Sequence, residues 1–293
     1  MKTKTLIKFL IHPPLQIHCW GGLGSQLFAL AFAIEVATKS PKRQISIIAH
    51  TSGVTQRHLE LKLIKLPQIE IFQIDDFISQ VKGDKQSHLS ISMSFLNLSR
   101  KLVKSILSTL QFLVCSDPPD RKIKPWTRQV RSHYFRRPID GASLILLTNA
   151  LCEYLSFDPN PKGNFVLHCR LGDLLTLENK LPLEASRVRK VTIEAKRIFK
   201  GIKLEVASDS PSEVEKYLPE LSEALIIKES PLKTLNLLAT SRVLIASTSK
   251  LSLWGVILGI AIGIERTVFI PHEMYDELCA ITSSRSSTNF ILY

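Results

Sequence analysis

The second half of the chain alternates short β-branched segments with longer amphipathic or apolar ones, and this alternation restricts its fold more than any other feature. Strands are predicted at residues 165–168, 203–207, 224–228, 242–246 and 267–270, the last taken as the final strand. Helices are predicted between them at residues 183–199, 212–218, 231–239 and 251–264. Strands that alternate with helices pair through crossover connections, which produces a parallel, doubly wound sheet. The sequence therefore predicts a Rossmann-like domain.

The first half begins with a similar unit. A strand at 16–20, a glycine-rich turn at 21–24, a helix at 26–39 and a strand at 45–50 follow one another, as in an α/β layer. Further segments are a strand at 69–74, a helix at 94–114, an irregular stretch at 116–137 and a helix at 142–155. The strongest turn cluster, rich in Pro, Asp, Asn and Gly, spans residues 158–163. It predicts an N-terminal α/β domain over residues 1–157 and the Rossmann-like domain over 158–293.

Length and composition fit this division. A chain of 293 residues with 45% hydrophobic content can fill two cores. It contains no apolar run of roughly 18 residues, the length needed to cross a bilayer, and the N-terminal run from Leu6 to Ile11 is interrupted by Lys8. An odd number of cysteines without Cys-x-x-Cys spacing argues against a disulfide scaffold and against zinc. These are Cys19, Cys115, Cys152, Cys169 and Cys279. A reducing compartment, the cytoplasm, is expected.

The net charge of +12 is concentrated in one stretch. Residues 95–137 hold ten basic side chains against Asp117 and Asp120. The basic residues are Arg100, Lys101, Lys104, Arg121, Lys122, Lys124, Arg128, Arg131, Arg136 and Arg137. Such an excess suits phosphorylated substrates, an anionic membrane or nucleic acid. Two alternatives stay open for the helix at 94–114: it packs on the N-terminal sheet, or its basic face makes a peripheral contact with the inner face of the membrane.

The glycine-rich turn is the first of four polar junctions between a strand and a helix. Gly21-Gly22-Leu23-Gly24 has Leu27 where the dinucleotide fingerprint needs its third glycine, and it lacks the Lys-Ser/Thr of a P-loop. An NAD enzyme and a P-loop NTPase are therefore disfavoured. The turn lets a ligand approach the backbone at a helix N-terminus, where free N–H groups favour anions. The alternative is a tight turn with no ligand.

The second junction, from His168 to Asp173, carries more chemistry. A guanidinium at a strand end, here that of Arg170, can bind two phosphate oxygens and stabilise charge on a departing nucleotide. His168 can exchange hydrogen bonds, and Asp173 can orient Arg170 or accept a proton. A structural Arg–Asp ion pair beside a core histidine is the alternative. A metal site is not expected, because no further ligand stands at suitable spacing.

The remaining two junctions follow the strands at 203–207 and 242–246. Asp209 can cap the next helix or accept hydrogen bonds from a guanine edge or a ribose. Ser247, Thr248 and Ser249 can cap the apolar helix that follows or bind phosphate at its N-terminus. Trp254, inside that helix, is expected in the core.

Taken in order, these four junctions resemble the family 11 glycosyltransferases, the α1,2-fucosyltransferases, and more loosely the wider fucosyltransferase superfamily. The Gly-Gly-Leu-Gly motif at 21–24 followed by Gln26, the His-x-Arg-x-Gly-Asp motif at 168–173, the Ser-Asp pair at 208–209 and the Ser-rich segment at 247–254 correspond to the family's motifs. The sequence departs from them at Ser25, Leu174, Leu251 and Leu253. The resemblance covers nearly the whole chain, most clearly from about residue 150 onward.

The resemblance implies a GT-B-like α/β enzyme: two Rossmann-type domains that face a cleft, with the N-terminal domain on the acceptor side, GDP-fucose in the C-terminal domain, and no metal or other cofactor. The reaction implied is inverting transfer of fucose to a glycan hydroxyl, the 2-OH of galactose. Arg170 would stabilise the departing β-phosphate, and the general base would be Asp173 or Glu178. The donor-binding residues implied are His168, Asp209, Ser247, Thr248, Ser249, Gly22, Gly24 and Gln26. A transferase with another GDP-sugar or linkage and a non-catalytic basic binding protein for membrane or nucleic acid stay open, although no nucleic-acid partner is expected.

Overall fold

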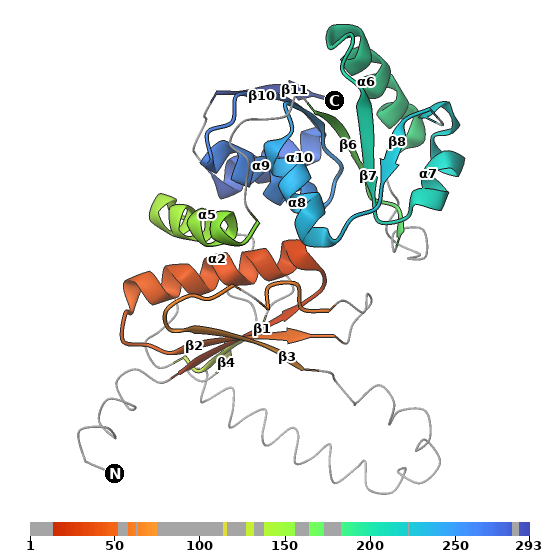
Figure 1. The fold of residues 1–293 in the computed structure, drawn as a ribbon. Helices are drawn as coiled ribbons and strands as arrows, with labels where there is room; N and C mark the ends of the chain where they lie inside the picture. Colours follow the sequence, from red (N-terminus) through yellow and green to blue (C-terminus); the bar gives the residue numbers. More distant parts are fainter. Residues whose placement is uncertain are drawn as a thin grey trace, which may run out of the picture. The chain divides into compact units, whose positions relative to one another are not determined.

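The structure is a computed structural model that describes residues 14–51, 58–62, 64–74, 114–115, 127–131, 138–155, 164–172, 183–221, 223–282 and 287–293 (Figure 1). Its contacts divide the chain into two units, Met1–Arg136 and Arg137–Tyr293, each of which is described by itself. Each unit holds one sheet, and all pairs of strands that define these sheets are parallel. The predicted α/β class with two parallel sheets is confirmed. The cleft between the domains stays a prediction.

The N-terminal unit is built on a five-stranded sheet in the order β3-β2-β1-β5-β4. Its strands are β1 (Leu15–Trp20), β2 (Ile45–His50), β3 (Ile69–Ile74), β4 (Val114–Cys115) and β5 (Gln129–Arg131). Helix α2 (Leu23–Lys39) lies along one face of this sheet (Figure 1). Leu15, Ile17 and Cys19 alternate along β1 and are buried on one of its faces, as the two-residue period of a strand requires.

The C-terminal unit contains a six-stranded sheet in the order β11-β10-β9-β6-β7-β8. Its strands are β6 (Phe165–Cys169), β7 (Leu204–Ser208), β8 (Leu225–Ile227), β9 (Val243–Ile245), β10 (Arg266–Ile270) and β11 (Thr288–Leu292). Its helices are α5 (Gly141–Leu155), α6 (Ala185–Ile198), α7 (Pro211–Tyr217), α8 (Pro231–Thr240), α9 (Lys250–Ala261) and α10 (His272–Ile281), with a short 3-10 turn η2 (Pro219–Leu221). Every residue of β6 and β9 is buried, so the centre of the sheet lies in the core.

Helices α8 and α9 pack closely because α9 carries glycines at the contact. A Cβ at Gly255 would lie 2.6 Å from the Cβ of Leu238 on α8. One turn later, a Cβ at Gly259 would overlap the guanidinium of Arg266, which enters this contact from the start of β10. Trp254 is completely buried, which confirms its expected core position.

The guanidinium of Arg266 is buried and bonded only to backbone carbonyls in the described part of the chain. Its Nη1 donates to the carbonyls of Leu238 (2.8 Å) and Ala239 (3.1 Å), and its Nη2 donates to those of Gly255 (3.0 Å) and Val256 (3.0 Å). Burial lowers the pKa of Arg266 to about 9, so the group stays charged at neutral pH. One side chain thus ties the end of α8 to the middle of α9.

Some predicted elements need correction. Val114 begins strand β4 and does not end a helix, and β5 lies in a stretch expected to be irregular. Helix α10 and strand β11 follow the strand taken as the last one. Strand β11 pairs in parallel with β10 and extends the sheet by one strand beyond the expected last one.

The division into units also falls before α5, earlier than the boundary expected at residue 158. Leu144, Leu147 and Leu151 form the buried stripe of α5, which contacts α8 and α9. Just ahead of α5, the N–H of Ile139 donates to the carbonyl of Ile281 at 3.0 Å. Helix α5 therefore belongs to the C-terminal unit, although the strongest turn signal follows it.

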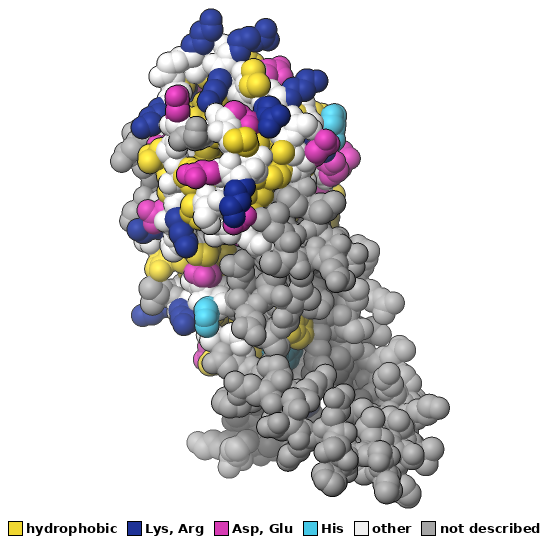
Figure 2. All heavy atoms as spheres, turned by 90° about the vertical axis from the view of Figure 1, so that its right-hand side faces the viewer, with side chains coloured by type: hydrophobic (Ala, Val, Ile, Leu, Met, Phe, Trp, Pro, Cys, Tyr) yellow, Lys and Arg dark blue, Asp and Glu magenta, His cyan; other side chains and the backbone are white. Residues whose placement is uncertain are grey.

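In the part of the chain that the structure describes, no helix combines the length and the apolar character needed to cross a membrane. On the face that Figure 2 shows, the described Lys and Arg side chains are interspersed with Asp and Glu. Most of the basic stretch at 95–137, including the helix expected at 94–114 up to residue 113, lies outside the described residues.

Candidate functional site

The carboxyl edge of the C-terminal sheet has a topological switch point between β6 and β9. From β6 the chain continues to β7 and β8 on one side, then returns to β9, β10 and β11 on the other. Open α/β sheets bind ligands outside the carboxyl ends of the strands at such a point. Arg170 follows β6 directly, and Ser247 lies two residues beyond the end of β9. Two of the predicted motifs therefore meet at this edge.

His168, the penultimate residue of β6, connects the two motifs. Its Nδ1 lies 2.6 Å from the Oγ of Ser252, 3.2 Å from that of Ser247 and 3.4 Å from that of Ser249. The N–H of Ser252 donates to the Oγ of Ser249, which caps α9, and the N–H of Ser247 donates to the Oγ of Ser252, each at 3.0 Å. The imidazole and three hydroxyls thus fix the loop between β9 and α9 against the end of β6.

This network makes His168 a positioning residue. The side chain is 5% exposed, and its described contacts lie within the C-terminal unit. Burial lowers the pKa of His168 to about 4; the charge of Asp209 opposes this change, and that of Arg170 adds to it. The ring is therefore neutral at pH 7. Its contact with a donor stays a prediction.

Ser252 was missed as a member of the site by sequence reasoning. It stands three residues after Ser249, the spacing at which a helix cap and the residue it caps meet. A hydroxyl at that position of an otherwise apolar helix was the available signal.

The neutral state of His168 predicts a pH dependence of stability. Between pH 6.5 and about 4 the unfolded chain binds a proton at this residue and the folded chain does not, so stability falls as the pH falls through this window. At about 1.4 kcal/mol per pKa unit, the total is on the order of 3 kcal/mol. We expect His168→Gln to reduce the loss of stability between pH 7 and 4.5, measured by urea unfolding. The matched variant His272→Gln, at an exposed histidine, should lose as much unfolding free energy between pH 7 and 4.5 as the wild type does. The same loss in all three proteins would contradict a neutral His168.

Asp209 holds the segment that carries Arg170. It follows β7, which pairs with β6, and its Oδ1 accepts from the N–H groups of Leu171 and Gly172, both at 3.1 Å. The carboxylate therefore fixes the backbone directly after Arg170. Asp209 is exposed, so it lies at the surface of the same edge.

Gly172 permits this contact by having no side chain. A Cβ there would lie 2.6 Å from the Oδ2 of Asp209 and 3.2 Å from the Oγ of Ser210. We expect Gly172→Ala to displace the segment and to lower the rate of the transfer reaction proposed below at least tenfold, since misplacement by about 1 Å can cost two orders of magnitude. Thermal unfolding and steady-state rates test this. Gly141→Ala, where no atom lies within 4 Å of the added methyl, is the matched control; equal rates in both variants would contradict a positioning role for Gly172.

The other predicted residues of this edge are placed as follows. Arg170 is half-buried, close enough for its charge to lower the pKa of His168. Ser247 and Ser249 are buried in the histidine network, whereas Thr248 between them is exposed. Asp173 and Glu178, the two predicted bases, lie outside the described residues.

The N-terminal unit presents its glycine turn in an equivalent position. The turn follows β1, which stands at the switch point between β2 and β5. Gly21 has a φ of 96°, which favours glycine, and Gly22 is the N-cap of α2. Gly24 is buried within the first turn of that helix. The backbone geometry of a strand-to-helix turn is thus present.

Gln26 has an internal role in this turn. It is 1% exposed, and its Nε2 donates to the carbonyls of Gly21 (3.2 Å) and His58 (2.8 Å). Its Oε1 accepts from the N–H of Glu60 at 3.0 Å. The amide therefore ties the segment 58–60 to the glycine turn, and its predicted contact with the donor stays a prediction.

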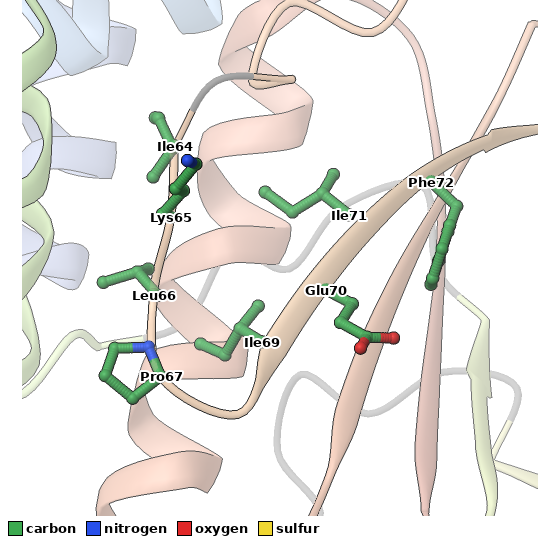
Figure 3. Close-up of a pocket in the computed structure, with 8 residues that line it drawn as sticks. All are labelled: Ile64, Lys65, Leu66, Pro67, Ile69, Glu70, Ile71 and Phe72. Atoms are coloured by element: carbon green, nitrogen blue, oxygen red, sulfur yellow. The ribbon is translucent and has the colours of Figure 1, made fainter.

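Two hollows among the described residues lie elsewhere. One is a shallow cavity of about 660 Å³ along the edge strand β3, lined by residues 64–67 and 69–72 (Figure 3). Lys65 and Glu70 are its charged lining residues, and the rest are apolar. A second cavity, of about 390 Å³, is lined by Lys196, Phe199, Glu220 and their neighbours. Neither contains a predicted site residue. No group of three His, Cys, Asp or Glu side chains that could hold a metal occurs among the described residues.

Comparison with known proteins gives structural similarities only. No protein-family model and no curated protein sequence matches the chain. The heptosyltransferase WaaC of E. coli, solved with ADP, is 10% identical over 95% of this chain and 93% of its own, with a TM-score of 0.49. The α1,6-fucosyltransferase NodZ from Bradyrhizobium, soaked with GDP-fucose, is 14% identical over 84% and 92%, with a TM-score of 0.47. A glycosyl transferase of family 9 from Veillonella parvula is 12% identical over 95% and 87%, with a TM-score of 0.44. All three scores are below 0.5, so they support no assignment of function, and membership of family 11 stays a prediction.

Proposed function

We propose that this protein is a glycosyltransferase that moves fucose from GDP-fucose to a hydroxyl of a glycan acceptor, the 2-OH of galactose. The observation that carries the proposal is the convergence at the switch point of the C-terminal sheet. An arginine, a carboxylate and a hydroxyl-rich helix N-terminus come from β6, β7 and β9 and share one sheet edge. Such a set suits a nucleoside diphosphate joined to a sugar.

In the proposed reaction the acceptor oxygen forms a bond to the anomeric carbon as the bond from that carbon to the β-phosphate oxygen breaks. The electron pair of the broken bond stays on the phosphate, so negative charge grows there in the transition state. Arg170 stabilises this charge through its two-pronged donor geometry. Thr248 and the N-terminus of α9 contribute further donors. The acceptor proton passes to Asp173 or Glu178.

Asp209 and His168 serve the same reaction indirectly. Asp209 holds the backbone after Arg170, and His168 holds the loop that carries Thr248. Pre-organisation of this kind lets the donors act without reorganising during the reaction. Gly22 and Gly24 would approach the sugar-phosphate from the N-terminal unit.

The test is a donor screen. The purified protein is incubated with GDP-fucose, GDP-mannose, UDP-galactose and ADP-sugars and a panel of galactose-terminated oligosaccharides, and the products are identified by mass spectrometry. We expect a fucosylated product with GDP-fucose and inversion at the anomeric carbon. Transfer from another nucleotide sugar would correct the donor, and absence of transfer and of donor hydrolysis with all of them would overturn the proposal.

The same assay tests the expectation that no metal takes part. We expect the rate to persist in excess EDTA, because the charge on the leaving group is balanced by Arg170 and helix N–H groups. The measurement is the initial rate with EDTA against the rate with added Mg²⁺ or Mn²⁺. A rate abolished by EDTA and restored by either ion would contradict this mechanism.

A further inference from the structure

Three aromatic side chains gather at the carboxyl edge of the N-terminal sheet, beside the glycine turn. Trp20 is the last residue of β1, His50 is the last residue of β2, and the two are direct partners in the parallel register. His18 lies two residues before Trp20 and therefore on the same face of β1. We refer to Trp20, His50 and His18 as the ring cluster.

The ring cluster is held rigidly. The rings of Trp20 and His50 are stacked, with centroids 4.5 Å apart and planes inclined by 10°. His50 is in turn fixed by its Nε2, which lies 2.9 Å from the Nδ1 of His18. His18 is 9% exposed, so the fixed end of the cluster lies within the unit. Rigid aromatic surfaces bind ligands with little loss of conformational entropy.

The other end of the cluster reaches the surface. Trp20 and His50 are both half-buried, whereas Trp254, the other tryptophan in the described ranges, is completely buried. Gly21 and Gly22 follow Trp20 directly and carry no side chains that could cover the edge. A ligand at this edge would meet an indole, an imidazole and backbone at close range.

This combination fits a sugar. A pyranose has an apolar face of C–H groups, which packs on an aromatic ring, and hydroxyls around its rim, which exchange hydrogen bonds with imidazole nitrogens. The ligand class is therefore a carbohydrate.

We infer that the ring cluster binds the acceptor glycan, with Trp20 as the stacking surface and His50 as the group that orients it. The identification of this ligand as an acceptor rests on the proposed function. The binding itself does not, because it needs only the N-terminal unit and no donor.

The experiment measures glycan binding by the whole protein without any donor sugar. Wild type, Trp20→Phe, Trp20→Ala and His50→Gln are applied to a glycan array with and without GDP, and the best ligand is titrated in solution. We expect Trp20→Ala to weaken binding on the order of tenfold, and Trp20→Phe to keep most of the affinity because it retains an aromatic face. Tyr154→Ala, which removes an exposed aromatic ring from α5 in the other unit, is the matched control and should bind as wild type. Thermal unfolding verifies that each variant is folded.

The outcomes separate this inference from the proposed function. Glycan binding that depends on Trp20, in a protein that turns over no nucleotide sugar, would support the carbohydrate site and refute the transferase. Normal transfer, with glycan affinity and acceptor KM unchanged in Trp20→Ala, would refute the site alone. Absence of binding by the wild type to every glycan on the array, with and without GDP, would also overturn the site.

Discussion

The Arg170→Lys variant is expected to fold as the wild type does and to lose roughly two to three orders of magnitude in sugar transfer. Lysine keeps the positive charge but lacks the planar fork that binds two phosphate oxygens at once. Loss of a comparable transition-state donor costs about 10²–10³ in rate. Because the interaction is needed most when the phosphate departs, kcat should fall more than the donor KM rises. Steady-state kinetics and GDP binding by calorimetry measure the two effects.

The matched control for this variant is Arg189→Lys. Arg189 lies on α6, where its Nε donates to Glu220 at 2.6 Å on the surface of the same unit. An exposed ion pair of this kind contributes little to stability, so its conversion should change neither the rate nor the unfolding temperature measurably. Near-normal transfer by a folded Arg170→Lys protein would remove Arg170 from the mechanism.

The strands and helices of the C-terminal unit were predictable because their local signals agree with the fold. Continuous β-branched and apolar runs such as 243–245 and 165–167 are typical of strands that are buried on both faces. Strand β11 and the short β5 could not be predicted in this way. Strand β11 contains Thr288, Phe290 and Ile291, which favour strands, but a run of five residues that includes Asn289 is too short to be told from a loop without its partner β10.

The sequence also located the four junctions, but it could not show which of their side chains face a ligand. Their place at these junctions predicted that His168 and Gln26 would contact the donor, and that contact stays a prediction. Each, however, directs its polar atoms to partners inside its own unit: His168 to the hydroxyls around Ser252, Gln26 to segment 58–60. Partners that are 84 and 32 residues away along the chain have no local signal. The same holds for the ring cluster, which depends on the register between β1 and β2.

The contact between Arg266 and α9 leads to the second large effect, a loss of stability in Gly259→Ala. A methyl group at residue 259 would occupy the place of the guanidinium, which four carbonyl contacts hold in the core. A flexible arginine on the surface would move aside at little cost. Here displacement of the guanidinium breaks hydrogen bonds from a charged group, each worth about 1.5–3 kcal/mol. It also leaves the buried carbonyl oxygens without a hydrogen-bond donor. We expect a loss of about 3–6 kcal/mol in the free energy of unfolding, or roughly 10 °C in the unfolding temperature, although alanine favours helix over glycine by about 1 kcal/mol.

A double-mutant cycle with Arg266→Met tests the cause of this loss. Methionine removes the guanidinium and leaves room for a methyl at residue 259, so adding Gly259→Ala to Arg266→Met should cost much less than adding it to the wild type. Gly141→Ala, with no atom within 4 Å of the new methyl, controls for the substitution itself. Chemical unfolding of the single and double variants gives the coupling free energy. Additive losses in the cycle would show that the steric conflict with Arg266 is not the reason why residue 259 is glycine.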